Sequence, residues 1–144
     1  MFVPLASPAW RGLSVALTWA ALAVLAGCGP GGNWVGVAYN GYSIETSRSA
    51  AQAGDVIFRI ANLKGQVLHQ LLIVQTDTPA NQLPLGANGQ VDESALKLAG
   101  RVDQVDVGQL ATLTAHLTPS HYVLLCNIVG HYQLGMHTDF TVTP

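Results

Sequence analysis

Three residues near the carboxyl end of the chain, Cys126, His131 and Met136, have side chains that bind soft metal ions and lie five residues apart. Cys126 is one of only two cysteines, and Met136 is the only methionine besides Met1. A thiolate, an imidazole and a thioether on one short segment suit a soft or borderline metal, copper above all. These residue types at this spacing therefore predict a copper site on residues 126–136.

The segments on either side of these residues have the composition of β-strands. Tyr122–Cys126 is a run of large apolar and β-branched residues, and Phe140 and Val142 alternate with a threonine further on. Asn127 and Gly130 interrupt the apolar pattern between them. We therefore expect a loop between two strands to carry the metal ligands.

The run CNIVGHYQLGM, from Cys126 to Met136, resembles the copper loop of the cupredoxins (blue copper proteins), with the C-x4-H-x4-M spacing of the rusticyanin and sulfocyanin group. The resemblance implies a Greek-key β-sandwich that binds one copper ion through two histidines, one cysteine and a weak axial methionine. The family usually has a proline two residues before the loop histidine, where this chain has Val129.

The second histidine ligand should come from a distant strand, and His69 is the candidate. It lies near the start of the apolar run Leu68–Val74, the position of the family's first histidine, well upstream of the cysteine. The alternative is a hydrogen-bonded core histidine without a metal. The remaining histidines, His116, His121 and His137, are expected at the surface, with His121 in a turn.

Short alternating strands bounded by turns predict an all-β fold, a Greek-key β-sandwich of about seven to eight strands. The least regular part, Asp77–Gly100, should contain one short helix with Asp92 as its N-cap and Gly100 after its end. The clearest strand patterns lie at Tyr42–Thr46, Val56–Ile60, Leu68–Val74 and Leu110–Leu117.

The amino terminus has the pattern of an exported lipoprotein. Arg11 precedes the apolar run Gly12–Leu25, which is shorter than a membrane-spanning helix requires. The following residues, ending at Cys28, resemble the lipobox of bacterial lipoproteins. We therefore expect a signal peptide at residues 1–27, with an uncleaved amino-terminal anchor as the alternative.

The resemblance makes Cys28 the acylated first residue of the mature chain. Residues 28–41 are then a flexible tether, and residues 42–144 are the copper domain. Trp34, Val35 and Val37 could instead form an extra edge strand.

A lipid on Cys28 leaves no cysteine pair for a disulfide; a Cys28–Cys126 bridge is the alternative. The protein would be anchored to the cell membrane or outer membrane, facing the periplasm or cell exterior.

The composition argues against several other functions. Only 10% of the residues are charged, the formal net charge is −2, and no basic stripe suggests a nucleic-acid partner. There is no C-x-x-C-H motif for a c-type haem. A binuclear copper site needs two loop cysteines, and a multicopper oxidase needs histidines beside the cysteine, where this chain has Leu125 and Asn127. An enzyme is therefore not expected.

The predicted function is electron transfer by one type 1 copper ion, between a donor and an acceptor of a respiratory or other electron-transfer chain. A copper storage or delivery lipoprotein is the alternative. We expect the protein to be a monomer. The loop carries no charge from Asn127 to Met136, so we expect an uncharged docking patch around His131. The members of this patch are Ile128, Val129, Tyr132 and Leu134.

Overall fold

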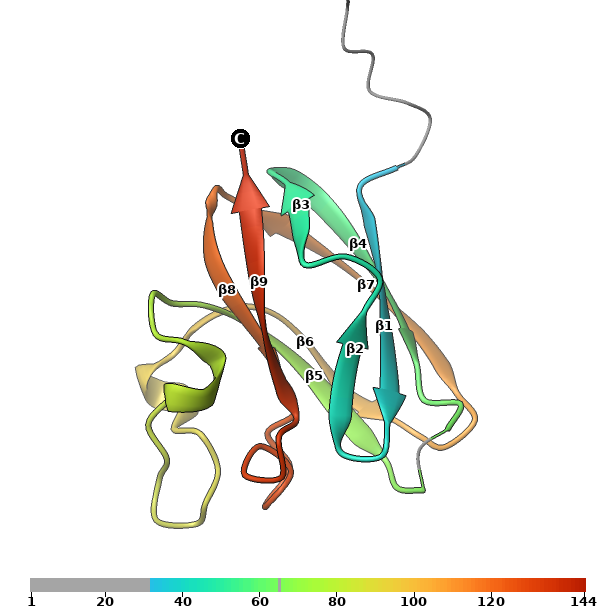
Figure 1. The fold of residues 1–144 in the computed structure, drawn as a ribbon, viewed down its shortest axis with the longest axis vertical. Coiled ribbons are helices and arrows are strands. Elements are labelled where there is room, and N and C mark those ends of the chain that lie inside the picture. Colours follow the sequence, from blue (N-terminus) through green and yellow to red (C-terminus); the bar gives the residue numbers. More distant parts are fainter. Residues whose placement is uncertain (1–31, 65) are drawn as a thin grey trace, which may run out of the picture.

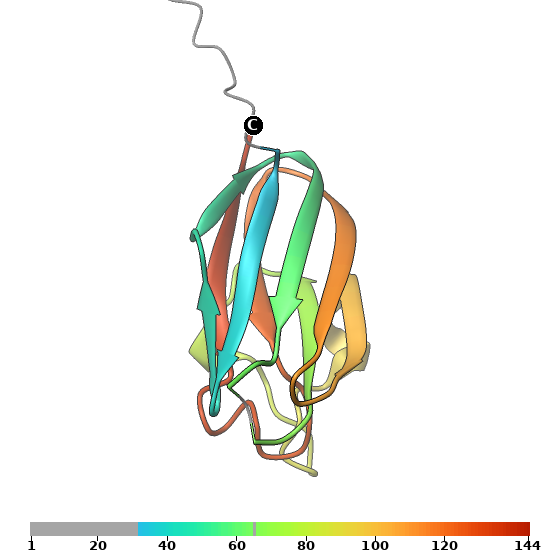
Figure 2. The same ribbon diagram turned by 90° about the vertical axis from the view of Figure 1, so that its right-hand side faces the viewer.

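The computed structural model describes residues 32–64 and 66–144, which form two β-sheets packed face to face (Figures 1 and 2). One sheet has the strand order β2-β1-β4-β7, and the other has the order β3-β9-β8-β5-β6. The strands are β1 (Trp34–Asn40), β2 (Ser43–Thr46), β3 (Ala50–Gln52), β4 (Gly54–Ala61), β5 (His69–Gln75), β6 (Lys97–Val105), β7 (Leu110–Leu117), β8 (Ser120–Leu125) and β9 (His137–Thr143). The predicted all-β sandwich is confirmed, with nine strands in these ranges.

Alternation along the strands places one core between the sheets. In β4, Val56, Phe58 and Ile60 are buried, whereas Asp55 and Arg59 face outward. Successive side chains of a strand point to opposite faces, so this pattern covers one face of the sheet and leaves the other in water.

Strands β5 and β8 differ because both of their faces are buried. Leu71–Val74 is fully buried, as the continuous apolar run predicts. The outer face is covered by the connection between β5 and β6, residues 76–96. Side chains of that connection, of the two strands and of the loop after β8 form a second core, whose members are Leu72, Val74, Ala80, Leu83, Val91, Val123, Leu125 and Tyr132.

The connection contains two short 3-10 turns, η1 (Ala80–Gln82) and η2 (Glu93–Ala95). The Asp92 side chain accepts a hydrogen bond from the Ser94 backbone N–H and caps η2, so the predicted short helix and its cap are present. Its predicted end at Gly100 is wrong, because β6 already begins at Lys97 and pairs with β5.

The predicted tether at residues 28–41 is wrong over the stretch 34–40, which is strand β1. This strand lies inside its sheet, antiparallel to β2 and parallel to β4, and so is not an edge strand. Its residues Val35, Val37 and Tyr39 are at most 1% exposed. The sandwich therefore begins before the predicted boundary at residue 42; residues 28–31 lie outside the described ranges.

Both ends of the described chain lie at one pole of the sandwich, where β1 begins and β9 ends (Figure 1). The turn between β1 and β2, the loop between β4 and β5, and residues 126–136 lie at the other pole. In the described ranges we find no helix of the length and apolar character needed to cross a membrane.

Candidate metal centre

Two neighbouring strands bring the predicted ligands together. His69 is the first residue of β5, and Cys126 directly follows the last residue of β8. These strands are antiparallel neighbours, with Leu72 opposite Leu125, so the start of β5 and the end of β8 lie at the same edge of the sheet. His131 then reaches this edge from the loop after Cys126.

The ligand loop, residues 126–136, is closed by its own backbone. The Cys126 N–H donates to the Met136 carbonyl at 3.0 Å, and the Met136 N–H donates to the His131 carbonyl at 3.1 Å. Gly130 and Gly135 have φ angles of +82° and +103°, which side chains rarely tolerate. The two glycines therefore allow the tight turns that bring Cys126 and Met136 back together.

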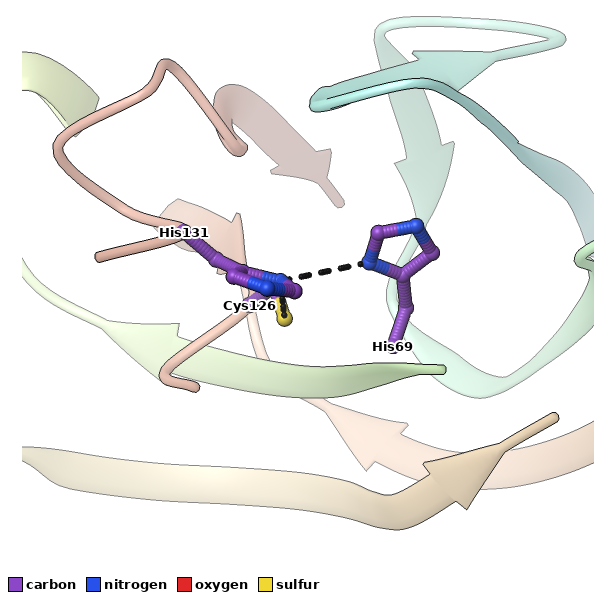
Figure 3. Close-up of side chains that lie close together, drawn as sticks. All are labelled: His69, Cys126 and His131. Atoms are coloured by element: carbon purple, nitrogen blue, oxygen red, sulfur yellow. Dashed lines mark hydrogen bonds between the residues drawn. The ribbon is translucent and has the colours of Figure 1, made fainter. Parts of the chain in front are cut away.

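The donor atoms of His69, Cys126 and His131 converge on one point (Figure 3). The Nδ1 atoms of the two histidines are 3.3 Å apart, and the Cys126 Sγ is 3.4 Å from the Nδ1 of His131. All three donors lie within 4.8 Å of one another. His69 and Cys126 are fully buried, and His131 is 9% exposed.

The two shorter separations, 3.3 and 3.4 Å, fit a metal ion at the point of convergence. Nitrogen and sulfur ligands lie about 2.0–2.3 Å from a transition metal, so neighbouring donors in such a site are separated by roughly 3.3–3.8 Å. The Nδ1 atoms of two buried imidazoles face each other here, with the cysteine sulfur beside them. This set of nitrogen and sulfur donors suits a soft or borderline cation.

Burial controls the ionisation of all three side chains. Desolvation lowers the pKa of His69, with the nearby His131 as a second cause, and it also lowers the pKa of His131. Both rings therefore favour the neutral form that binds metals. Desolvation raises the pKa of the Cys126 thiol, although hydrogen bonds from the Ile128 and Gln70 backbone oppose it. Metal binding must then displace the thiol proton.

Gln70, next to His69, makes three hydrogen bonds beside the site, one of them to the cysteine. Its backbone N–H donates to the Cys126 Sγ at 3.4 Å, and its side-chain oxygen accepts from the Asn127 N–H at 3.2 Å. Its carbonyl accepts a hydrogen bond from the Tyr39 hydroxyl at 3.1 Å. Sequence reasoning missed Gln70, although its place beside His69 was a usable signal.

Two tyrosines from the first hairpin also surround the histidines. The Tyr39 ring lies 4.7 Å from the His69 ring between centroids. Tyr42, in the turn between β1 and β2, stands edge-on to His131 at 5.1 Å and to His69 at 6.4 Å. Tyr42 is 43% exposed, so it forms the outer cover of the site. Nothing in the sequence around these tyrosines marks either contact.

Met136 is fully buried at the end of the loop and belongs to the main core, as Cys126 does.

His116 is exposed, as predicted, and pairs with Asp55 at 2.8 Å. His121 lies inside β8 and is only partly exposed, so its predicted place in a turn is wrong. Its ring contacts the Thr76 carbonyl and Asp139.

The predicted docking patch is only partly at the surface. Val129 is 62% exposed and Leu134 is 59% exposed, whereas Ile128 is half-buried against the main core. Tyr132 is wrongly assigned to the patch, because it is 5% exposed and lies in the second core. The connection 76–96 covers its ring, which the sequence of the loop alone does not reveal.

Comparison with known proteins places the chain in a family. The model of the sulfocyanin (SoxE) domain matches residues 20–144. The chain belongs to the sulfocyanin domain family. The sulfocyanin site is thus a blue copper site, and the buried His69, Cys126 and His131 donors agree with one type 1 copper ion per chain. No curated protein sequence matches the chain.

Solved structures share the fold of this sulfocyanin-domain protein. Reduced auracyanin from Roseiflexus castenholzii is 20% identical, with a TM-score of 0.57, covering 78% of this chain and 98% of that one. The copper protein rusticyanin is 22% identical, with a TM-score of 0.57 and coverages of 78% and 79%. Auracyanin A from Chloroflexus aurantiacus, a "blue" copper protein, is 16% identical, with a TM-score of 0.51 and coverages of 76% and 98%.

Proposed function

We propose that this protein is a membrane-tethered electron carrier in which His69, Cys126 and His131 hold one type 1 copper ion and Met136 is the weak axial ligand. The convergence of the two histidine Nδ1 atoms, from residues 62 apart in the sequence, supports this proposal most directly. Two imidazoles and one thiolate in a closed, buried site match the ligand set of blue copper electron-transfer sites.

Copper in such a site supplies one-electron chemistry between its Cu(I) and Cu(II) states. The chain's own residues exclude water from the site and hold the donors in one arrangement. His131 is the ligand nearest the surface, and the exposed Val129 and Leu134 flank it in the loop. Donor and acceptor would be redox proteins that dock briefly on this uncharged end.

The test is the colour of the copper-loaded protein. The full chain in detergent, loaded with Cu(II), should absorb intensely in the visible range through sulfur-to-copper charge transfer. Cys126→Ala should abolish the absorption and His69→Ala should change or bleach it. His116→Ala, which removes an exposed histidine on the outer face of β7, is the matched control and should leave the spectrum unchanged.

A colourless Cu(II) protein with intact Cys126 would remove the blue copper assignment. Fast loss of copper to a chelator would instead favour storage or delivery, because such proteins must release their ion. The burial of His69 and Cys126 argues for slow exchange.

We further propose that Cys28 carries the lipid anchor, on the basis of the lipobox-like run Leu25–Cys28. Cys28→Ala should release the domain from membranes or leave an unprocessed precursor, because durable attachment requires more than one acyl chain. Membrane fractionation and intact mass measure both outcomes. Cys126→Ala, which removes the other cysteine, should stay with the membranes. Unchanged mass and membrane retention in Cys28→Ala would exclude lipidation there.

A further inference from the structure

Two side chains of the ligand loop bind the connection between β5 and β6, residues 76–96. Asn127 directly follows the cysteine ligand, and Tyr132 directly follows the loop histidine. Both are buried, at 2% and 5% exposure. The connection therefore contacts the loop beside each of its first two ligands.

Asn127 pairs with the carboxyl half of the connection. Its Oδ1 accepts from the Val91 N–H at 2.8 Å, and its Nδ2 donates to the Val91 carbonyl at 3.0 Å and to Glu93 Oε1 at 2.9 Å. Its own carbonyl accepts from the Gln90 side chain. A buried amide that loses its hydrogen-bond partners is left unsatisfied at a large cost in free energy, so this contact resists opening.

Tyr132 pairs with the amino half of the connection. Its hydroxyl donates to the Ala80 carbonyl at 2.6 Å and accepts from the Leu83 N–H at 3.0 Å. Its ring packs in the second core with Leu72 and Leu125. The hydroxyl thus joins the loop to η1, while the ring joins it to the sheet.

The connection is itself fixed to the sheets. The Ala80 N–H donates to Asp139 of β9 at 2.8 Å, and the same carboxylate contacts the His121 ring of β8 at 2.9 Å. At the other end, Glu93 pairs with Arg101 of β6 at 3.1 Å. A segment bonded to β9 and β6 can transmit its rigidity to the loop.

We propose that Asn127 and Tyr132 are positioning residues and that the connection 76–96 is a brace that holds Cys126 and His131 at their ligand spacing before copper binds. This inference rests on the proposed copper site. The loop contains Gly130 and Gly135, so its own sequence provides little stiffness. The two side-chain contacts provide it from outside.

A braced loop presents the same donor geometry to Cu(I) and to Cu(II). With the brace loosened, Cys126 and His131 can shift toward the tetragonal arrangement that Cu(II) prefers, which should lower the reduction potential and alter the Cu(II) spectrum. The same loosening should show in the copper-free protein, because the backbone bonds that close the loop would open more often.

The test compares two tyrosines with equivalent bonds in the full chain. Tyr132→Phe removes only the hydroxyl that bridges Ala80 and Leu83. Tyr122→Phe is the matched control: the Tyr122 hydroxyl also bonds a backbone N–H and carbonyl, both of Thr118, at the end of β8 away from Cys126. Asn127→Ala tests the other half of the brace if Tyr132→Phe folds poorly.

In copper-free protein, Tyr132→Phe should speed amide hydrogen exchange at Met136 and His131 by roughly five- to 150-fold, the range expected when two hydrogen bonds are lost. With copper, it should lower the reduction potential and shift the absorption spectrum. Tyr122→Phe should leave all three measurements at the wild-type values.

The brace is excluded when Tyr132→Phe and Asn127→Ala both keep wild-type exchange, potential and spectrum, or when Tyr122→Phe changes them equally. The exchange measurement needs no copper, so it separates the two proposals. A loosened loop in a protein that never turns blue would overturn the copper function and retain the brace. A blue protein whose loop exchanges at the wild-type rate in Tyr132→Phe and Asn127→Ala would retain the copper function and overturn the brace.

Discussion

Tyr42 covers the two histidines on their solvent side. It is 43% exposed, and its ring stands edge-on to both imidazoles, so it separates them from solvent without being a ligand. A residue in this position controls access to the site and leaves the donor atoms in place.

Tyr42→Ala should therefore weaken copper retention while preserving the colour. Removing an aromatic contact worth about 0.5–1.5 kcal/mol should speed copper loss to a chelator by roughly two- to tenfold. The loss of absorbance with time measures this. Tyr42→Phe keeps the ring and should behave as wild type; equal rates in the alanine variant would show that Tyr42 does not cover the site.

The proximity of the candidate ligands was predictable to different degrees. Cys126, His131 and Met136 share one loop, so their rare side chains and regular spacing reveal them directly. His69 required the family resemblance. Tyr39 and Tyr42 were missed because their contacts arise only when separate strands align, and an isolated tyrosine in a sequence predicts no such contact.

Among the elements, β1 differs most from expectation, and it contributes to both the core and the site. Its glycine-rich surroundings suggested a flexible tether, yet its alternating Val35, Val37 and Tyr39 are buried. Local composition predicts a linker wherever glycines gather, whereas burial depends on the pairing of β1 with β2 and β4, which local composition does not specify.

Removing β1 should abolish folding. A chain that begins at Tyr42 loses three buried side chains worth about 1.5–3 kcal/mol each, which together approach a typical domain stability of about 5–15 kcal/mol. A chain that begins at Gly32 keeps β1 and should melt like the full protein. Circular dichroism during heating distinguishes them. Cooperative melting of the shorter chain at the full-length temperature would show that residues 34–40 are dispensable.

Tyr132 was wrongly assigned to the docking patch for the same reason, because local sequence does not specify burial. Sequence places it in an uncharged loop beside Val129 and Leu134, and nothing local distinguishes the exposed residues from the buried one. The irregular connection 76–96 makes the distinction by covering one side of the loop. Irregular segments are where sequence patterns are least informative, and here one of them supplies Ala80, Leu83 and Val91 to the second core.

For the whole molecule, we propose that electrons enter and leave at the pole that carries the ligand loop. Leu134→Lys should slow electron self-exchange, because two docking copies would then bring like charges together. Leu98→Lys is the matched control: Leu98 is 40% exposed and pairs with Val74, near the opposite end of β5 from His69.

Self-exchange measured by magnetic resonance line broadening should fall in Leu134→Lys, with the visible spectrum unchanged. Added salt should partly restore the rate, because it screens the introduced charges. Wild-type protein should respond only weakly to salt. An unchanged rate in Leu134→Lys would mean that electrons leave by another face.

The position of β1, the strand that follows the proposed anchor, sets the height of the copper site above the membrane. β1 begins at the pole opposite the ligand loop and spans about 23 Å at roughly 3.3 Å per residue. With the lipid on Cys28, residues 28–33 add at most about 20 Å. An upright domain would thus hold its copper face on the side away from the bilayer. Partners that project well above the lipid surface, or diffuse freely there, can contact this face directly. A partner whose docking surface is level with the bilayer requires the domain to tilt until its long axis lies along the membrane.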